Sequence, residues 1–405
     1  MHTECPSPVT PSQPAVYDPM PVRTSLFHCD RLVRRLGHLS LVACCFLAIS
    51  GCLPGLYGST RPLIKIGLAA PFEGLGRPLG YEALQGVKMA LAERNAAGGV
   101  GGYMVELVAL NDSDQPLEAA AQALEFAADP AVLGVITGWR QAVAAAALPA
   151  YRQAGVAVVV PWTVPADLVD PSHGVVLLAA DSDRVVRAAA DLVAVVVGDA
   201  GVAVVGDAAA VAPYLALASR PVWRVSLPDS PTATTTGDAM RRLFLARPAP
   251  PAALVLVTTG AQAGDIVRAV REIPWDGPIL ISPEGADPQL VDVAGAAANG
   301  VLIASAAPAG IDLAERHNGD DAPSSGLGPR AVQAYDATQV LLAAIEAAIR
   351  ADGQPTRDGV IRALRDVKAS GLQGEIKIDS DGRRRDARVW WYQINDTHYP
   401  GVLVQ

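Results

Sequence analysis

Apolar residues along the chain come in short continuous runs that alternate with longer, alanine-rich stretches of helical periodicity. The first run, Leu63–Ala70, predicts a buried strand, and residues 80–97 predict the helix that follows it. Continuous apolar strands alternating with helices are typical of a parallel sheet covered on both faces. The alternation predicts further strands at 103–110, 132–137, 156–160, 174–178, 202–205, 222–225, 253–257 and 279–281, and helices at 115–128, 141–153, 183–197, 211–219, 235–246 and 262–272.

The last quarter of the chain has a different pattern. Residues 330–350 and 357–367 predict two more helices. Residues 375–378 and 387–394 then flank a turn signal at 379–382, which predicts an antiparallel hairpin. Two strand–helix series before this segment predict an α/β fold with two doubly wound parallel-sheet lobes.

The N-terminal segment differs in composition from the rest. Residues 1–30 are proline-rich and aperiodic, which predicts either a disordered extension or a chain that starts at Met20 rather than Met1. Residues 31–51 begin with basic side chains and continue into an apolar run that is too short to span a bilayer. This order is typical of a signal peptide.

The signal peptide ends in the sequence Leu-Ala-Ile-Ser-Gly-Cys, which resembles the lipobox of bacterial lipoproteins. The resemblance implies cleavage before Cys52 and lipid attachment to its thiol. Residues 52–61 would then form a short tether to the membrane. The alternative is an ordinary signal peptide with an incidental cysteine. Either way, we expect an exported protein in the cell envelope, on the outer face of the cytoplasmic membrane or in the periplasm.

Composition excludes several classes of protein. Hydrophobic residues make up 51% of the chain and charged residues 18%, so disorder is not its main state. The net charge of −9, without a basic stripe, argues against nucleic-acid binding. All five cysteines lie at or before Cys52, and the later histidines are far apart. We therefore expect no disulfide, no metal centre and no cofactor in the body.

Ligands of open parallel sheets bind beyond the carboxyl ends of the strands, so the residues just after each strand are candidates for a site. The candidates are aromatic, charged or polar: Phe72, Arg77, Trp139, Arg140, Gln141, Trp162, Thr163 and Glu284. Two tryptophans and a carboxylate suit a small-molecule cleft. The alternative roles are packing in a lobe core for the tryptophans, a charge at a helix start for Glu284, and a solvated rim for the arginines.

The enzyme alternatives have little support in the sequence. Gly74, Gly76 and Gly80 follow a strand as in a dinucleotide-binding loop, but their spacing is one residue too long. Asp112 stands where a ribose-binding acid would. The paired carboxylates Asp112/Asp114 and Asp181/Asp183 fit turn or cap roles better. We therefore expect a binding protein rather than an enzyme.

Several segments, taken in their order and spacing, are similar to the branched-chain amino acid (Leu/Ile/Val) binding proteins of ABC transporters. They are residues 64–71, 86–99, 111–119, 282–285, 335–337 and 371–382. The resemblance implies the type I periplasmic-binding fold, in which two lobes joined by a three-crossing hinge close on a ligand. It places residues 62–181 with 306–376 in lobe 1, and residues 182–305 with 377–405 in lobe 2.

The resemblance also implies a site. The ligand carboxylate would meet hydroxyls and backbone N–H groups at a helix start in lobe 1. The ligand ammonium would meet Glu284, and Asp181 would lie between the lobes. The chain departs from the family at four positions, because Gln141, Val164, Leu79 and Gly260 replace the usual serine, threonine, aromatic residue and tyrosine. Thr163 stands beside the lost threonine, and Arg77 and Arg140 could add positive charge.

The resulting expectation is a monomeric, lipid-anchored solute-binding protein. It would deliver a small polar solute, such as an amino acid or a related amide or organic acid, to the permease subunits of an ABC importer. The alternative is a ligand-sensing or cell-wall-regulatory lipoprotein on the same fold, without transport.

Overall fold

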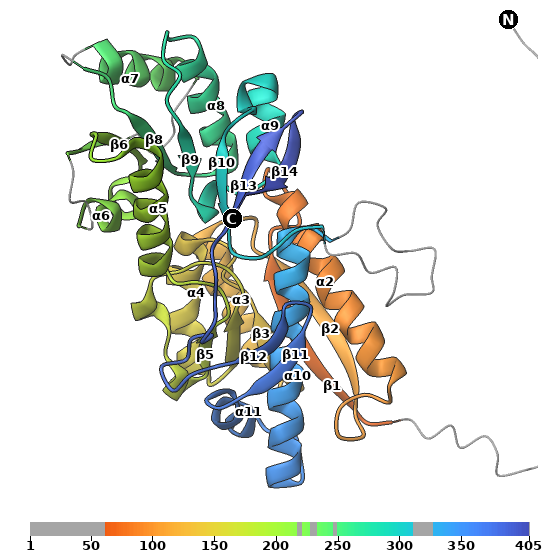
Figure 1. The fold of residues 1–405 in the computed structure, drawn as a ribbon. Helices are drawn as coiled ribbons and strands as arrows, with labels where there is room; N and C mark the ends of the chain where they lie inside the picture. Colours follow the sequence, from red (N-terminus) through yellow and green to blue (C-terminus); the bar gives the residue numbers. More distant parts are fainter. Residues whose placement is uncertain (1–60, 217–220, 227–232, 246–248, 311–326, 405) are drawn as a thin grey trace, which may run out of the picture. The chain divides into compact units, whose positions relative to one another are not determined.

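The computed structural model describes residues 61–216, 221–226, 233–245, 249–310 and 327–404 (Figure 1). The predicted signal peptide, Cys52 and the tether up to residue 60 lie outside the described residues. Residues 61–405 group into one unit by their contacts. In the part of this unit that the structure describes, no helix is both long and apolar enough to cross a bilayer.

The first sheet is fully parallel, with the strand order β2-β1-β3-β4-β5. Its strands are β1 (Leu63–Ala70), β2 (Met104–Asn111), β3 (Val132–Ile136), β4 (Ala157–Val160) and β5 (Val175–Leu177). Its helices are α2 (Arg77–Ala96), α3 (Pro116–Ala128), α4 (Gln141–Ala154), α10 (Pro329–Asp352) and α11 (Arg357–Leu364). The small ribbon of β11 (Lys368–Gly371) and β12 (Gly374–Lys377) packs on α10. We call these elements lobe 1.

The second sheet is mixed, with the strand order β14-β13-β10-β9-β8-β6-β7. Its strands are β6 (Val202–Gly206), β7 (Val222–Ser226), β8 (Ala253–Val257), β9 (Ile279–Ile281), β10 (Leu302–Ser305), β13 (Trp390–Asn395) and β14 (His398–Leu403). All pair in parallel except β13 and β14. Its helices are α5 (Ser182–Val197), α6 (Ala208–Ala216), α7 (Ala233–Leu245), α8 (Gly260–Arg271) and α9 (Gln289–Ala294). We call these elements lobe 2.

The chain passes between the lobes at three connections. They run from β5 to α5, from β10 to α10, and from β12 to β13. The predicted α/β fold with two parallel-sheet lobes and three crossings is therefore confirmed. The apolar runs that predicted the strands are buried: every residue of β3, β4, β6, β8 and β9 is inaccessible to solvent or nearly so.

The predicted C-terminal hairpin is wrong. Residues 375–378 and 387–394 do not pair, because β12 pairs with β11 whereas β13 pairs with β10 and β14 in the other sheet. The turn signal at 379–382 is real but local, since the Asp379 N–H donates to Arg383 O at 2.9 Å. The chain then crosses to lobe 2. The actual hairpin turns at Asp396 and Thr397, both of which have positive φ.

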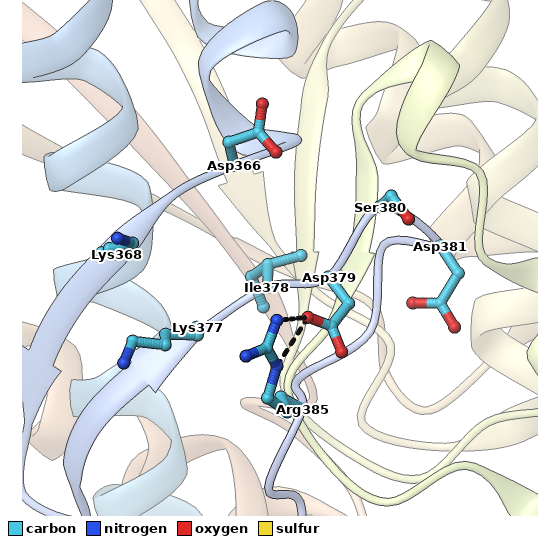
Figure 2. A pocket seen from close by; sticks show the side chains of 8 residues that line it. All are labelled: Asp366, Lys368, Lys377, Ile378, Asp379, Ser380, Asp381 and Arg385. Carbon is cyan, nitrogen blue, oxygen red and sulfur yellow. Dashed lines mark hydrogen bonds and ion pairs between the residues drawn. The ribbon is translucent and has the colours of Figure 1, made fainter.

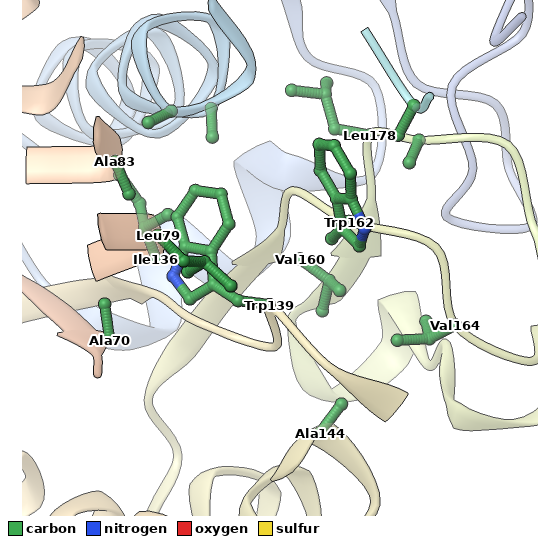
Figure 3. Close-up of a cluster of buried hydrophobic side chains, with 14 of the residues drawn as sticks. Ala70, Leu79, Ala83, Ile136, Trp139, Ala144, Val160, Trp162, Val164 and Leu178 are labelled. Atoms are coloured by element: carbon green, nitrogen blue, oxygen red, sulfur yellow. The ribbon is translucent and has the colours of Figure 1, made fainter. Parts of the chain in front are cut away.

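Close helix packing explains one glycine of the family-like segments. A Cβ at Gly86 of α2 would lie 2.0 Å from Ala331 O of α10, so only glycine lets the two helices approach so closely. The side chains around this part of lobe 1 form a dense core that includes Trp139, Trp162 and Leu79 (Figure 3).

Candidate functional site

A small cavity lies at the carboxyl ends of the strands, between residues of lobe 1 and residues of lobe 2. Its volume is about 40 Å³, which is room for only a few water molecules. Six apolar residues of lobe 2, three valines, an alanine and two prolines, form part of its wall. The polar residues that line it are Gln141, Thr163, Ser182, Tyr214, Ser282 and Glu284.

Three of the predicted site residues meet at this cavity. Gln141 begins α4 just after β3, Thr163 follows β4, and Glu284 follows β9. The carboxyl ends of parallel strands bring them to one edge of each sheet, as the sequence pattern predicts. The site is thus assembled from the two lobes, and a change in their distance changes its volume.

Two hydroxyls at the cavity have no partner. The Oγ1 of Thr163 and the Oγ of Ser282 are buried, and neither makes a hydrogen bond within the described structure. A buried hydroxyl without a partner costs free energy, and such groups in native proteins usually have a reason. A solute in the cavity is one reason, because it can bond both.

Glu284 places a carboxylate against the start of α4. Burial raises the pKa of Glu284 above its usual value, while the charge of Arg140 and a hydrogen bond from the Gln141 backbone lower it in part. The first-turn N–H groups of a helix favour an anion, which explains the bond from Gln141. The acid from lobe 2 and the helix start from lobe 1 therefore face each other across the cavity.

Arg140 lies beside the cavity and is fully engaged. Its Nε donates to Asp114 Oδ2 at 2.6 Å, its Nη1 to Glu284 O at 2.7 Å, and its Nη2 to Asp287 Oδ2 at 3.1 Å. Burial by itself would lower the pKa of Arg140, but the charges of Asp114, Glu284 and Asp287 raise it. The guanidinium is thus a permanent cation whose partners belong to the protein.

The two tryptophans lie in the core rather than at the cavity (Figure 3). Trp139 is buried and donates its indole N–H to Ala69 O at 3.1 Å. Trp162 is buried and donates to Pro283 O of lobe 2 at 3.0 Å. The packing role that the sequence left open is the one they have in the structure, although Trp162 also contacts the segment that carries Glu284.

The other predicted site residues lie away from the cavity. Phe72 packs edge-on against Tyr81, with ring centroids 5.7 Å apart. The exposed guanidinium of Arg77 lies 5.2 Å from the centroid of the Tyr81 ring. Asp181 is buried at the start of α5, where it accepts from the Arg184 N–H at 2.8 Å. None of the three is among the residues that line the cavity.

Tyr214 of α6 is a cavity residue that sequence reasoning missed. Burial raises its pKa well above the usual value, and the charge of Glu284 raises it further. The family resemblance places a second-lobe tyrosine near Gly260, after β8, whereas Tyr214 comes after β6. The available signal was an aromatic residue in a helix that follows a buried strand of the second series.

A larger hollow on the surface lies elsewhere and has the character of a charged groove. It has a volume of about 870 Å³ and lies beside β11, β12 and the turn after them (Figure 2). Two of its charges pair with each other, since Arg385 Nη2 lies 2.7 Å from Asp379 Oδ1. Within the described ranges, no group of three or more His, Cys, Asp or Glu residues is arranged to hold a metal ion.

Solved structures share the fold. A leucine binding protein, LivK, from Thermotoga maritima is 22% identical, with 83% of this chain and 96% of that one covered and a TM-score of 0.67. The branched-chain amino acid transporter substrate binding protein LivJ from Streptococcus pneumoniae, in complex with isoleucine, is 18% identical over 84% and 99%, with a TM-score of 0.70. A fatty acid ABC transporter substrate-binding protein from Thermomonospora curvata is 19% identical over 85% and 92%, also with a TM-score of 0.70.

Sequence comparison agrees with the fold. The Leu/Ile/Val-binding protein homolog 2 of Brucella abortus (strain 2308) is 31% identical over 111 residues, which span 27% of this chain and 30% of that protein. The similar proteins are described as binding proteins rather than enzymes, as the sequence predicts. A family model described as periplasmic binding protein matches residues 63–398. The chain therefore belongs to the periplasmic binding protein family.

Proposed function

We propose that this protein binds a small zwitterionic or cationic solute, of which an amino acid is the simplest example, and delivers it to an ABC importer. The family assignment implies a location outside the cytoplasm. The observation that carries the proposal is the meeting of Glu284, from lobe 2, with Gln141 and Thr163, from lobe 1, at one cavity. Closure of the lobes would enclose a solute between these groups.

The polarity of the cavity supports an amino-acid-like solute. A solute ammonium would pair with the Glu284 carboxylate, and a solute carboxylate would replace Glu284 at the first-turn N–H groups of α4. Thr163 and Ser282 supply unpartnered hydroxyls, and the apolar wall of lobe 2 suits a short aliphatic side chain. The structurally similar proteins are named for leucine, for branched-chain amino acids and for fatty acids. A carboxylate and several hydroxyls favour the amino acids.

An anionic solute fits the cavity less well. The residues that line it include one carboxylate and no basic side chain. Arg140, which could have met an anion, already bonds Asp114, Asp287 and the Glu284 carbonyl, and Arg77 points to solvent. We therefore rank organic acids below amino acids and amides.

The sequence supports a lipid anchor and a transport partner. Cys52 follows a lipobox-like segment, so we propose that it carries the lipid and that residues 52–61 tether the body to the membrane. Permease subunits of an ABC importer are the proposed partners, and the proposed state of the protein is a monomer.

A thermal-shift screen tests the proposal. L-amino acids, their amides, dicarboxylates and fatty acids are added to the purified protein. A solute at about 100 times its Kd should stabilise it by roughly 2.7 kcal/mol. Glu284→Gln should weaken the binding of an amino acid about 30-fold or more, because it removes one partner of an enclosed charge pair. The control is Glu272→Gln, at an exposed acid of lobe 2.

Three outcomes would contradict the proposal. A shift with dicarboxylates alone would reverse the assigned charge preference. Equal affinity in the Glu284→Gln variant would place the solute outside this cavity. A solute that binds but whose uptake by cells does not depend on the protein would favour the sensing or cell-wall-regulatory alternative.

A further inference from the structure

We propose that Arg140 and Asp287 form a lock that holds the two lobes together through the turn at residues 283–287. The proposal goes beyond solute binding, because it concerns what closes the protein. It rests on contacts that the protein makes with itself, and it stands whether or not the proposed solute class is correct.

The turn at residues 283–287 of lobe 2 offers three backbone carbonyls to lobe 1. Pro283 O accepts from the indole of Trp162 at 3.0 Å, and Glu284 O accepts from Arg140 Nη1 at 2.7 Å. Ala286 O accepts from Arg330 Nη2 at 3.1 Å. Carbonyls of a surface turn ordinarily bond water. Here the donors are buried side chains of the other lobe. The turn is therefore a docking point for lobe 1.

Asp287 supplies the charged contact of the same turn. Its side chain is 3% exposed, its Oδ2 lies 3.1 Å from Arg140 Nη2, and its Oδ1 accepts from the Gln289 N–H at 2.9 Å. Its position depends on Gly260, because a Cβ there would lie 2.2 Å from Asp287 Oδ1. Lobe 2 thus holds the carboxylate in place from two sides before lobe 1 arrives.

Lobe 1 orients the arginine in a similar way. Arg140 immediately precedes α4, and its Nε donates to Asp114 Oδ2 of the same lobe at 2.6 Å. Only Nη1 and Nη2 reach across to lobe 2. A guanidinium that is already fixed loses little entropy when it meets a second carboxylate. The planar guanidinium of arginine can donate to two carboxylates at once, from different edges.

The lock lies next to the solute cavity but is distinct from it. Neither Arg140 nor Asp287 lines the cavity, whereas Glu284, between their contact points, does. Bringing the lobes together removes water from the Arg140–Asp287 pair and strengthens its attraction. Closure then draws on contacts within the protein as well as on contacts with the solute. A solute therefore binds more tightly than its own contacts would allow, because less of its binding free energy is used for closure.

Distances between the lobes test the lock without any solute. Two spin labels are attached at the exposed positions Leu117 of α3 and Leu245 of α7, as Leu117→Cys and Leu245→Cys. The labels go into the full chain with its five native cysteines replaced by serine, purified in denaturant and refolded so that no solute is carried over. Pulsed electron resonance then gives the distribution of label distances.

We expect one dominant distance in the protein with the lock intact. Asp287→Asn keeps the acceptor for Gln289 but removes the charge, and should move about half of the molecules or more to a second, distinct distance. Arg140→Met should open the lobes at least as far, because it also removes the bond to Glu284 O. The double variant should be no more open than Arg140→Met, because without Arg140 the charge of Asp287 has no cation left to meet. Gly260→Ala should also open the lobes, since it displaces Asp287 while keeping every charged group.

The control is Asp265→Asn, which removes a carboxylate paired with Arg268 inside α8 and should leave the distances unchanged. Unchanged distances in both Asp287→Asn and Gly260→Ala would overturn the lock. So would opening in the double variant that equals the sum of the two single effects. If Asp287→Asn does not fold, Gly260→Ala alone decides. The measurement contains no solute, so a failed solute screen does not affect it.

Discussion

Arg383 Nη1 lies 2.6 Å from Asp181 Oδ2 and joins two of the three connections between the lobes. Asp181 ends the first connection and caps α5 through the Arg184 N–H. Arg383 lies in the third connection, where the Leu177 N–H also donates to Gly382 O at 2.8 Å. The first and third connections are thus bonded side by side, so a hinge motion of the lobes has to bend them together.

Asp181→Ala should therefore reduce stability more than binding. The variant loses a helix cap and an ion pair whose arginine is partly exposed, which together are worth roughly 1–3 kcal/mol. Urea unfolding measures this loss, and the affinity for the solute found in the screen should change less than about 3-fold, within the variation expected of a site with no direct contact. Asp183→Ala, at an exposed neighbour, is the control. Lost binding with unchanged stability would restore Asp181 to the ligand-binding role that the sequence suggests.

Strand and helix positions in the two series could be predicted because the buried positions of each element are apolar, which gives a clear pattern in the sequence. Residues 253–257 and 279–281 are strands with the expected bounds, since every position is apolar and buried. The hairpin could not be found in the same way. Its turn at Asp396 and Thr397 uses positive φ without glycine, whereas the sequence offers a conventional turn signal at 379–382 that closes no strand pair. The strand Leu302–Ser305 is absent from the predicted series, although residues 301–304 form an apolar run like the one at 279–281.

The candidate site could be predicted only as far as single strands define it. Gln141, Thr163 and Glu284 each follow a strand, and the rule for parallel sheets brings them together. The partners of Arg140 could not be predicted, because Asp114 follows a different strand of the same lobe and Asp287 belongs to the other lobe. The sequence likewise does not show whether Trp139 and Trp162 lie in the core or line the cavity.

Asp112→Asn should stabilise the protein at neutral pH. Burial raises the pKa of Asp112 to about 6, the hydrogen bond from the Asp114 N–H lowers it in part, and the charge of Asp114 adds to the rise. A carboxyl whose pKa is higher in the folded state destabilises the fold when ionised, so its cost is absent below about pH 4 and complete above about pH 6. Asparagine keeps the acceptor for the Asp114 N–H and removes the charge.

Urea unfolding at a series of pH values measures this effect. The variant and the natural protein should be equally stable near pH 4, and the variant should gain up to about 3 kcal/mol by pH 7.5. Burial also raises the pKa of Asp336 to about 6, and hydrogen bonds from Leu372 and Gln373 lower it in part. Asp336 therefore leaves a pH dependence of the same sign in both proteins. A difference that is constant with pH would show that Asp112 does not titrate in this range.

Cys52→Ser should release the protein from the membrane fraction. Each methylene of an attached acyl chain contributes about 0.8 kcal/mol to anchoring, and two chains hold a protein stably where one does not. The serine variant offers no thiol for the lipid. Cell fractionation with an antibody to the body detects the change. Cys45→Ser, in the apolar run before the proposed cleavage site, is the control and should remain in the membrane fraction.

Thr163→Val should lower the affinity for the solute without lowering the stability of the protein, which separates a binding role from a structural one. The Oγ1 of Thr163 is buried beside the cavity and has no partner among the described residues, and valine has nearly the same shape. Removing an unpartnered buried hydroxyl should leave stability unchanged or raise it by about 1 kcal/mol, because its desolvation is no longer a cost. Solute affinity should fall about 10-fold, since a hydrogen bond of about 1.4 kcal/mol is lost in the complex.

Thr137→Val is the matched control for this variant. Thr137 is also buried with an unpartnered Oγ1, but it does not line the cavity. Both variants should behave alike in urea unfolding, and only Thr163→Val should weaken the solute in calorimetric titration. Equal affinity in the two variants would mean that the solute does not use the Thr163 hydroxyl. A lower affinity for the solute in both variants would mean that strain in lobe 1, rather than a direct bond, controls the affinity.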